Sequence, residues 1–334
     1  MRKENLKNLL RLDLGGISRH RTELMGIAAL MILCCHADQF GVPMSDLFKR
    51  VCHYCNLGVE VFFLCSGMGM FRSLERSKVD DESIFSWYRR RFTRLLVPYL
   101  LLSIPYWLAV TVAEHGTLWS FLLNLSTYTF WSEHVGAWFV AALIPLYLVT
   151  PALYWILKKS KLTYWTLVLL LFLLFNVFYD RSLDVHTDLL ANICWVGVRI
   201  PCFLIGLGTA EYVFRPLKLN ILLPVILPMV LHHFLDVDHD SWCLTFLLAV
   251  PLAVFSAWLL DFLPRSVCSV MSFFGVISLE SYLANIYLKN LAPGIAATMS
   301  CNALSDNLFL EYSVVLVLGT AIAFAAWKLG KKIS

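Results

Sequence analysis

The chain has 334 residues, of which 59% are hydrophobic and only 15% are charged, whereas soluble globular proteins carry roughly 25% charged residues. This composition excludes an ordinary soluble enzyme and predicts an integral membrane protein. The net charge of +4 follows from basic loops between apolar stretches, so it gives no reason to expect a nucleic-acid partner.

Along the chain, residues 1–21 are basic and contain no apolar core, which predicts a cytoplasmic leader rather than a signal peptide. Residues 22–334 are predicted to form one integral-membrane domain, because apolar stretches of nearly the roughly 20 residues that cross a bilayer recur throughout. An all-α transmembrane bundle is expected, since backbone groups in lipid must be hydrogen-bonded within the segment. About ten spans are predicted, near 22–41, 57–73, 95–113, 136–157, 162–179, 190–213, 217–234, 242–262, 270–290 and 308–329.

Lys and Arg residues are concentrated in alternate loops, which predicts that both termini are cytoplasmic. His36 then lies in the outer half of the membrane, about 14 residues or 21 Å into the first span. A titratable group at this depth usually faces a cavity, and a neutral imidazole is the commonest general base. A helix-end histidine that reaches external water is the simpler interpretation.

The second and third predicted spans carry further ionisable residues. Glu60 begins the second span at a depth similar to that of His36, so its carboxylate is a candidate to orient the imidazole. Arg91 and Arg94 are three residues apart on one helical face at the entrance to the third span, where two guanidinium groups can clamp a phosphate. Positive-inside topology also explains basic residues at this place, although not the extension of Arg94 into the apolar stretch.

Later spans add candidate substrate-binding residues. Arg199 lies well inside the sixth span, where a cation needs a partner or a wet cavity, and the nearby Pro201 predicts a kink. The other candidates are polar or aromatic residues within spans or at their ends: Glu133, His134, Trp138 and Glu280.

Two segments carry metal-capable side chains, but no metal is expected. "CHYC", residues 52–55, is a single cysteine pair without a second, and "HHFLDVDHD", residues 232–240, has no framework that fixes its geometry.

Taken together, ordered stretches across most of the chain resemble the integral-membrane acyltransferase family 3, the bacterial O-acyltransferases. The stretches that carry the resemblance are "LMGIAALMILCCH", "GVEVFFLCSG", "RRRFTRLLVPY", "GAWFVAALIPLYLVTP", "RIPCFLIGLG" and "FFGVISLESYL".

The resemblance implies transfer of an acyl group, commonly acetyl, from cytoplasmic acyl-CoA to a hydroxyl of an envelope or exported polysaccharide, a glycolipid or a related acceptor. It also implies a multi-pass protein of the bacterial cytoplasmic membrane, in contact with membrane lipids. By the family pattern His36 is the catalytic histidine, and Arg91 and Arg94 are the paired arginines. Whether His36 acts as general base or as acyl carrier stays open, as does the oligomeric state, including a homo-oligomer.

The sequence departs from the family pattern at two positions. Met25 stands where the family usually has a basic residue, and Arg21, one turn earlier on the same helical face, is expected to substitute for it at the donor site. Asn285 stands where many members have a histidine.

Two other function classes fit the same polar residues. Cavity-lining charges and broken helices also suit a transporter or flippase of a lipid-linked sugar, and the two departures suit a non-catalytic membrane sensor. A His36 variant that binds acyl-CoA but transfers nothing would favour the enzyme.

Overall fold

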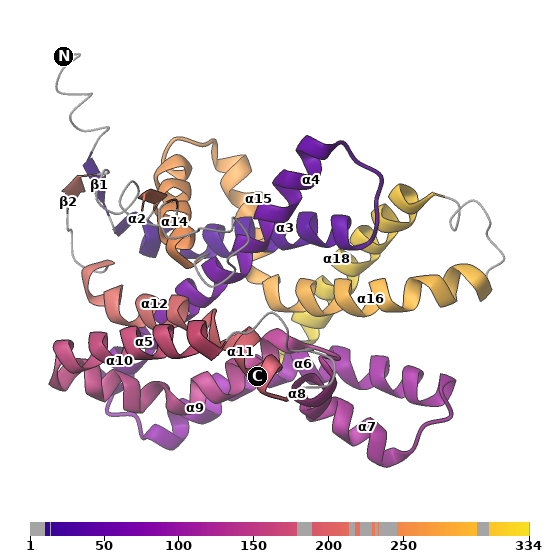
Figure 1. The fold of residues 1–334 in the computed structure, drawn as a ribbon, viewed down its shortest axis with the longest axis horizontal. Coiled ribbons are helices and arrows are strands. Elements are labelled where there is room, and N and C mark those ends of the chain that lie inside the picture. The colour runs from indigo at the N-terminus through magenta and orange to yellow at the C-terminus, as the bar shows by residue number, and fades with distance from the viewer. Residues whose placement is uncertain are drawn as a thin grey trace.

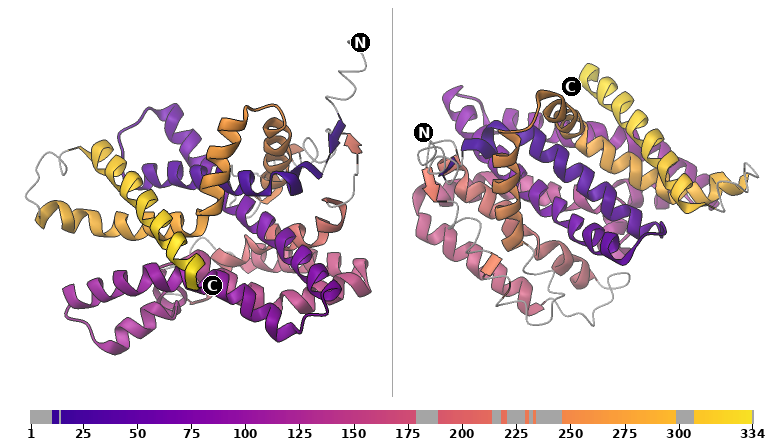
Figure 2. Two further views of the ribbon diagram at one scale, coloured as in Figure 1. Left: turned by 180° about the vertical axis from the view of Figure 1, so that it is seen from behind. Right: turned by 90° about the horizontal axis from the view of Figure 1, so that it is seen from above.

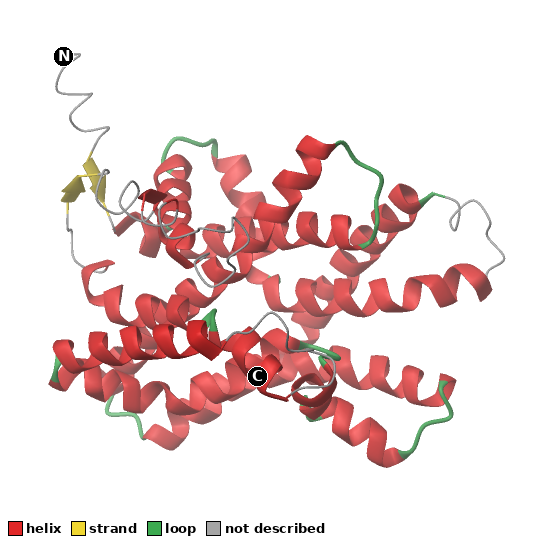
Figure 3. Ribbon diagram, in the orientation of Figure 1, coloured by secondary structure: helices red, strands yellow, loops and turns green. Residues whose placement is uncertain are grey.

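The structure is a computed structural model in which helices account for most of the chain. It describes residues 11–13, 15–178, 189–213, 218–220, 229–230, 233, 246–298 and 307–333. The helices pack together as one bundle (Figure 1), and the described strands are two three-residue segments that pair with each other (Figure 3). The all-α fold predicted from hydropathy is therefore confirmed.

The main helices of the bundle each coincide with an apolar stretch of the sequence. They are α3 (Arg21–Gln39), α5 (Gly58–Val79), α6 (Ile84–Ala113), α9 (Trp138–Lys159), α10 (Lys161–Phe178), α11 (Leu189–Gly197), α12 (Ile200–Val213), α14 (Phe246–Leu260), α15 (Arg265–Val276), α16 (Ser278–Thr298) and α18 (Leu308–Ile333). Five helical segments of the described chain are long and apolar enough to cross a membrane, or six if the bent pair α15–α16 counts as one. Ten spans and cytoplasmic termini stay predictions.

The observed helices differ from several of the predicted spans. Helix α6, which corresponds to the third predicted span, begins at Ile84 rather than near 95, because Ser83 caps its N-terminus by accepting a hydrogen bond from the Ser86 amide. The ninth span is bent by 68° between α15 and α16 rather than straight. The seventh span, near 217–234, lies mostly outside the described residues, and within it Lys218–Asn220 forms strand β2 rather than helix.

Shorter elements join or flank the long helices. Strand β1 (Arg11–Asp13) pairs antiparallel with β2, and α2 (Gly15–Arg19) precedes α3. The helices α4 (Asp46–Tyr54) and η1 (Cys55–Leu57) connect α3 to α5, whereas α7 (Leu118–Leu125) and α8 (Tyr128–Glu133) connect α6 to α9.

Small residues allow the central helices to touch through their backbones. A Cβ atom on Gly67 of α5 would lie 2.0 Å from the Phe203 carbonyl oxygen of α12. A Cβ on Gly26 of α3 would lie 1.8 Å from the Met271 carbonyl oxygen of α15. Such close crossings are typical of membrane helices, where packing rather than water exclusion drives association. The crossings join α5 to α12 and α3 to α15 within the bundle, of which Figure 2 gives two further views.

The outer faces of the bundle are apolar. Leu170 of α10 and Val317 of α18 are 57% and 70% exposed, whereas Phe63 of α5 is fully buried among its neighbours. Exposed apolar surface of this extent on long helices indicates contact with lipid.

Candidate active site

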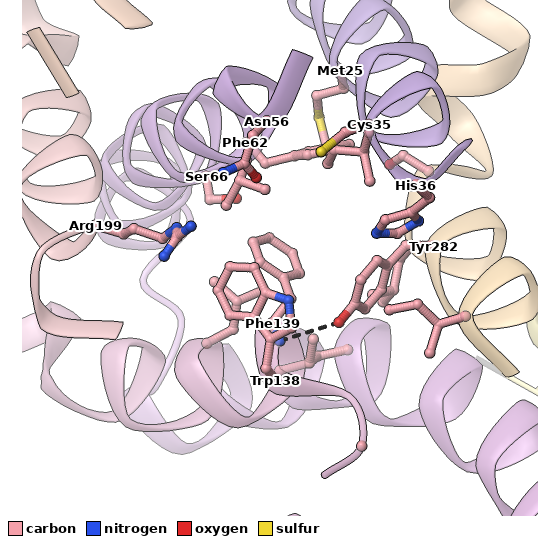
Figure 4. A pocket seen from close by; sticks show the side chains of 18 of the residues that line it. Met25, Cys35, His36, Asn56, Phe62, Ser66, Trp138, Phe139, Arg199 and Tyr282 are labelled. Carbon is pink, nitrogen blue, oxygen red and sulfur yellow. Dashed lines mark hydrogen bonds between the residues drawn. The ribbon is translucent and has the colours of Figure 1, made fainter. Parts of the chain in front are cut away.

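A cavity of about 760 Å³ lies among α3, α5, α6, α9, α16 and the α11–α12 segment. Its wall is mixed: apolar residues such as Met25 and Phe62 alternate with Ser66, Tyr282 and ionisable groups. In the close view, His36 and Arg199 lie on opposite sides of the cavity (Figure 4). This size and mixture are typical of small-molecule sites.

The cavity follows the long axis of α3, and contacts with α5 define its two ends. Gly58, at the start of α5, packs against Ala28 of α3, whereas Gly69 packs against the Arg21 side chain. The two helices are therefore antiparallel, with Arg21 at one end of the site and His36 at the other. Fifteen residues separate Arg21 from His36 on one helix, which corresponds to about 22 Å.

Arginines line the cavity at the Arg21 end. Arg91 donates from Nε to Ser73 Oγ at 2.8 Å, and the same oxygen accepts from Trp87 Nε1 at 2.9 Å. Ser73 thus holds the Nε side of the Arg91 guanidinium group, and Arg91 lines the cavity. Arg94 lines the cavity one turn further along α6, and within the described part of the chain it has no ion-pair or hydrogen-bond partner.

Arg21 lies at this end but does not line the cavity. Its Nε donates to the Cys65 carbonyl oxygen of α5 at 3.1 Å, and its guanidinium group covers Gly69. Ser73, which binds Arg91, lies one turn further along the same face of α5. Arg21 therefore adds positive charge behind the arginine pair, whereas Met25, one turn along α3, faces the cavity itself.

His36 lies at the opposite end, half-buried in the last turn of α3. Polar residues from two helices line the cavity with it, next to apolar residues such as Ile286: they are Gln39 from the same helix and Tyr282, Lys289 and Asn290 from α16. Asn290 donates to the Tyr106 hydroxyl oxygen at 3.3 Å. A hydroxyl-bearing ligand at this end would therefore meet an imidazole and several hydrogen-bonding groups.

Arg199 forms the side wall of the cavity opposite His36. The chain leaves helical geometry at residues 198 and 199, between α11 and α12, so the interruption expected near Pro201 is present. The Arg199 guanidinium group lies 4.2 Å from the ring centre of Trp195 and 5.1 Å from that of Trp138. Cation–π contact with two indoles holds the cation in place and satisfies part of its charge.

The Glu60 carboxylate pairs with Arg199, not with His36. Its Oε1 lies 3.2 Å from Arg199 Nε, and the two side chains are 2% and 5% exposed. The prediction that Glu60 orients His36 is corrected by this contact, because α5 turns Glu60 away from the cavity and towards α12. Burial of both charges in mutual contact is the arrangement that membrane interiors require.

His134 lies next to this pair and has a defined tautomer. The Asn192 amide nitrogen donates to the Trp131 carbonyl oxygen at 3.0 Å, so its Oδ1 accepts from His134 Nδ1 at 2.7 Å. The neutral ring then carries its proton on Nδ1, and Nε2 is the acceptor. His134 and Trp138 both line the cavity.

The remaining predicted residues lie elsewhere. Glu133 is exposed and Glu280 is buried at the start of α16, and neither lines the cavity. Asn285 faces α18: its amide donates to the Ser281 carbonyl oxygen at 2.8 Å, and Gly319 packs against it. The histidine expected at that position from the family pattern would meet α18 rather than the cavity.

Sequence reasoning missed Lys289, Asn290, Gln39 and Tyr282. A signal was present for Lys289, because a lysine at the end of a span that the sequence predicts to face outside opposes the usual excess of basic residues inside. The face of α16 that carries Tyr282 could not be identified without the bend that precedes it.

The metal-capable segments form no metal site in the part of the chain that the structure describes. No group of three His, Cys, Asp or Glu side chains converges there, and Cys52 and Cys55 are free thiols. Of residues 232–240, only His233 is described.

A protein-family model described as an acyltransferase domain matches residues 24–328 of the chain. Comparisons with curated proteins and with solved structures gave no significant match.

Proposed function

The chain belongs to the acyltransferase family 3, and from this premise we propose that it transfers an acyl group, acetyl in the first instance, from cytoplasmic acyl-CoA to an acceptor hydroxyl. The acceptor we propose is an envelope or exported polysaccharide, a glycolipid or a related molecule, and the site of action is the bacterial cytoplasmic membrane. Residues 22–334 act as one membrane unit and residues 1–21 as a cytoplasmic leader. One observation carries the proposal: a single cavity contains Arg91 and Arg94 at one end and His36 at the other.

The arginine end suits the donor. The phosphates of CoA are multiply charged, and Arg91 and Arg94 offer planar forks of N–H donors that match phosphate oxygens. Arg21 strengthens the positive potential from behind. The extended pantetheine arm then runs along α3 past Met25 and carries the thioester towards His36, about 17 Å further along that helix.

The His36 end suits the acceptor chemistry. The acceptor hydroxyl oxygen attacks the thioester carbonyl carbon while the imidazole removes the hydroxyl proton; the carbon–sulfur bond then breaks, and the proton passes from His36 to the departing thiolate of CoA. A general base of this kind accelerates transfer by about 10² to 10⁴-fold. Confinement of both reactants in one cavity lowers the entropic part of the barrier. In the alternative route, His36 first attacks the thioester and releases CoA, and the resulting acyl-imidazole then passes the acyl group to the acceptor hydroxyl.

Arg199 and its aromatic neighbours suit a sugar-bearing acceptor. Trp138 and Trp195 line the cavity on the side opposite His36, and flat apolar faces next to hydrogen-bond donors match the two kinds of surface on a sugar ring. Arg199, His134 and Trp138 are thus the proposed acceptor-binding residues.

The test compares ester-linked acyl groups released by mild alkali from envelopes of cells that carry the wild type, His36→Ala or no copy. Loss of the same acyl species in the last two strains, identified by mass spectrometry, is the expected result. His53→Ala is the matched control, because His53 is exposed on α4 and its loss leaves the esters unchanged. Immunoblots of membranes must show equal amounts of each variant.

Unchanged esters in the His36→Ala strain would contradict the proposal. Movement of a lipid-linked sugar across the membrane without acylation would then favour the transporter, and ligand binding without either would favour the sensor.

A further inference from the structure

We infer that the acceptor carries an anionic group, a carboxylate or a phosphate, next to the hydroxyl that is acylated, and that Lys289 binds this group. The inference rests on the proposed function and adds the chemical class of the acceptor to it.

The charges that line the cavity are one-sided. Its described lining contains Arg91, Arg94, Arg199 and Lys289 but no Asp or Glu. Glu60, directly behind the wall, compensates Arg199. The donor phosphates would compensate the two arginines of the other end. Neither Glu60 nor the donor phosphates would compensate the charge of Lys289.

Lys289 lies at the His36 end of the cavity. On α16 the cavity-lining residues follow one helical face from Ser278 through Tyr282 to Lys289, a distance of about 16 Å. The next residue, Asn290, contacts Tyr106 of α6, which lies twelve residues or about 18 Å beyond Arg94 on that helix. Helices α6 and α3 both begin at the arginine end, so Tyr106 and His36 lie at similar distances from that end of the cavity.

Lys289 is half-buried and has no ion-pair or hydrogen-bond partner among the residues that the structure describes. A half-buried ammonium group near the end of a membrane helix loses part of its hydration, a cost that a paired anion or a ligand offsets. Its position in a cavity wall next to a candidate base points to an anionic ligand rather than to a structural role. An ammonium group acts as a point charge and has no fork geometry, so it accepts either a carboxylate or a phosphate.

The neighbouring side chains favour the same ligand. Gln39 and Asn290 each present an amide at this end of the cavity, and amide N–H groups can support an anion already held by a cation. An acceptor built from an acidic sugar, or from a sugar linked through phosphate, would place its charge at Lys289 while a ring hydroxyl reaches His36.

The experiment measures acetyl transfer from radiolabelled acetyl-CoA by the purified full chain in nanodiscs. Three soluble probes are compared: methyl glucoside, methyl glucuronide and glucose 1-phosphate. The wild type is expected to favour the charged probes over the neutral one by about tenfold or more in kcat/KM, the range that one charge-assisted hydrogen bond supplies. Methyl glucuronide tests recognition of a carboxylate, and glucose 1-phosphate tests recognition of a phosphate.

Lys289→Gln is expected to lower transfer to the charged probes towards the rate of methyl glucoside and to leave the neutral probe within about twofold. Lys289→Arg should keep the preference. Lys49→Gln is the matched control, because Lys49 is an exposed lysine of α4 outside the cavity. Equal kcat/KM values for the three probes in the wild type would overturn the inference, as would an equal loss for all probes in Lys289→Gln.

A separate readout distinguishes the inference from the proposed function. If His36→Ala and the wild type transfer equally little acetyl to every probe, acylation itself fails. Binding of the same probes, measured by isothermal titration calorimetry, then decides the charge preference. Tighter binding of glucuronide or glucose 1-phosphate that disappears in Lys289→Gln supports the subsite, and equal binding of all three probes overturns it.

Discussion

The buried ion pair between Glu60 and Arg199 provides the sharpest test of how this bundle is held together. Glu60→Gln keeps the shape of the side chain but removes its charge, which leaves the Arg199 cation uncompensated in a site only 5% exposed. Breaking a buried pair in this way costs about 3–5 kcal/mol. The indoles of Trp138 and Trp195 remain in place and preserve about 2 kcal/mol of cation–π attraction, so the lower part of the range, about 3 kcal/mol, is expected.

The corresponding change in melting temperature follows from the size of the chain. An unfolding entropy of about 2.1 cal/mol/K per residue gives about 0.7 kcal/mol/K for 334 residues. A loss of 3 kcal/mol then lowers Tm by about 4 °C, and by more if the helices stay formed in the unfolded state, because the entropy change is then smaller. Thermal unfolding in detergent, followed by size-exclusion chromatography, measures this shift.

A double-mutant cycle isolates the pair. Arg199→Met alone leaves Glu60 as the unpaired charge, whereas Glu60→Gln with Arg199→Met removes both charges and is expected to recover much of the lost stability, with a coupling of about 2–3 kcal/mol. Glu133→Gln, which alters an exposed acid, should leave Tm unchanged. Additive effects of the two single substitutions would refute the reasoning, since they would mean that the two charges do not stabilise each other.

Two further predictions concern the helix crossing and the donor site. Gly67→Ala should abolish accumulation of folded protein, because its Cβ would lie 2.0 Å from a backbone oxygen of α12. Gly16→Ala should be tolerated, because the nearest neighbours of its Cβ would lie at 3.7 Å. Equal membrane yields of the two variants would contradict the crossing. Arg94→Gln should weaken binding of acetyl-CoA about 10 to 100-fold through loss of a charge-assisted phosphate contact, as measured by equilibrium binding. Arg89→Gln, an exposed arginine outside the cavity, serves as its control, and the same affinity in both variants would exclude the arginine pair as the donor site.

Hydropathy predicted the helices well because the constraint it reports is local. Each apolar stretch must satisfy its own backbone in lipid, so α3, α9 and α18 could be located from composition alone. The bend between α15 and α16 could not, because "FFGVISLE" contains no proline, and its one charged residue, Glu280, lies three residues after Ile277, where the two helices meet. It depends on how that segment packs against α3, which is a property of two helices together.

For the candidate site, too, the sequence located individual residues better than it predicted their contacts. His36 and Arg199 were identified because each is costly at the depth where the sequence places it, and Arg91 and Arg94 were identified by their spacing on one helical face and by the family resemblance. All four line one cavity. Pairing was predicted less well: depth along the chain put Glu60 level with His36, but the rotation of α5 about its axis directs the carboxylate to α12. Rotation is fixed by tertiary contacts such as the Gly67 crossing, which no single helix encodes.

The glycine crossings of α3 also determine how this protein could change its choice of acyl group. Backbone atoms of α15 and of α5 contact α3 on two sides, at Gly26 and near Gly58, so the helix that carries His36 has no room to shift sideways. A longer acyl chain cannot be accommodated by helix movement there. It must take space from removable side-chain atoms of the wall near His36, such as those of Ile32, one turn earlier on α3. Variation in donor length among related chains should therefore be found in the volumes of such side chains, while the two crossings keep their small residues.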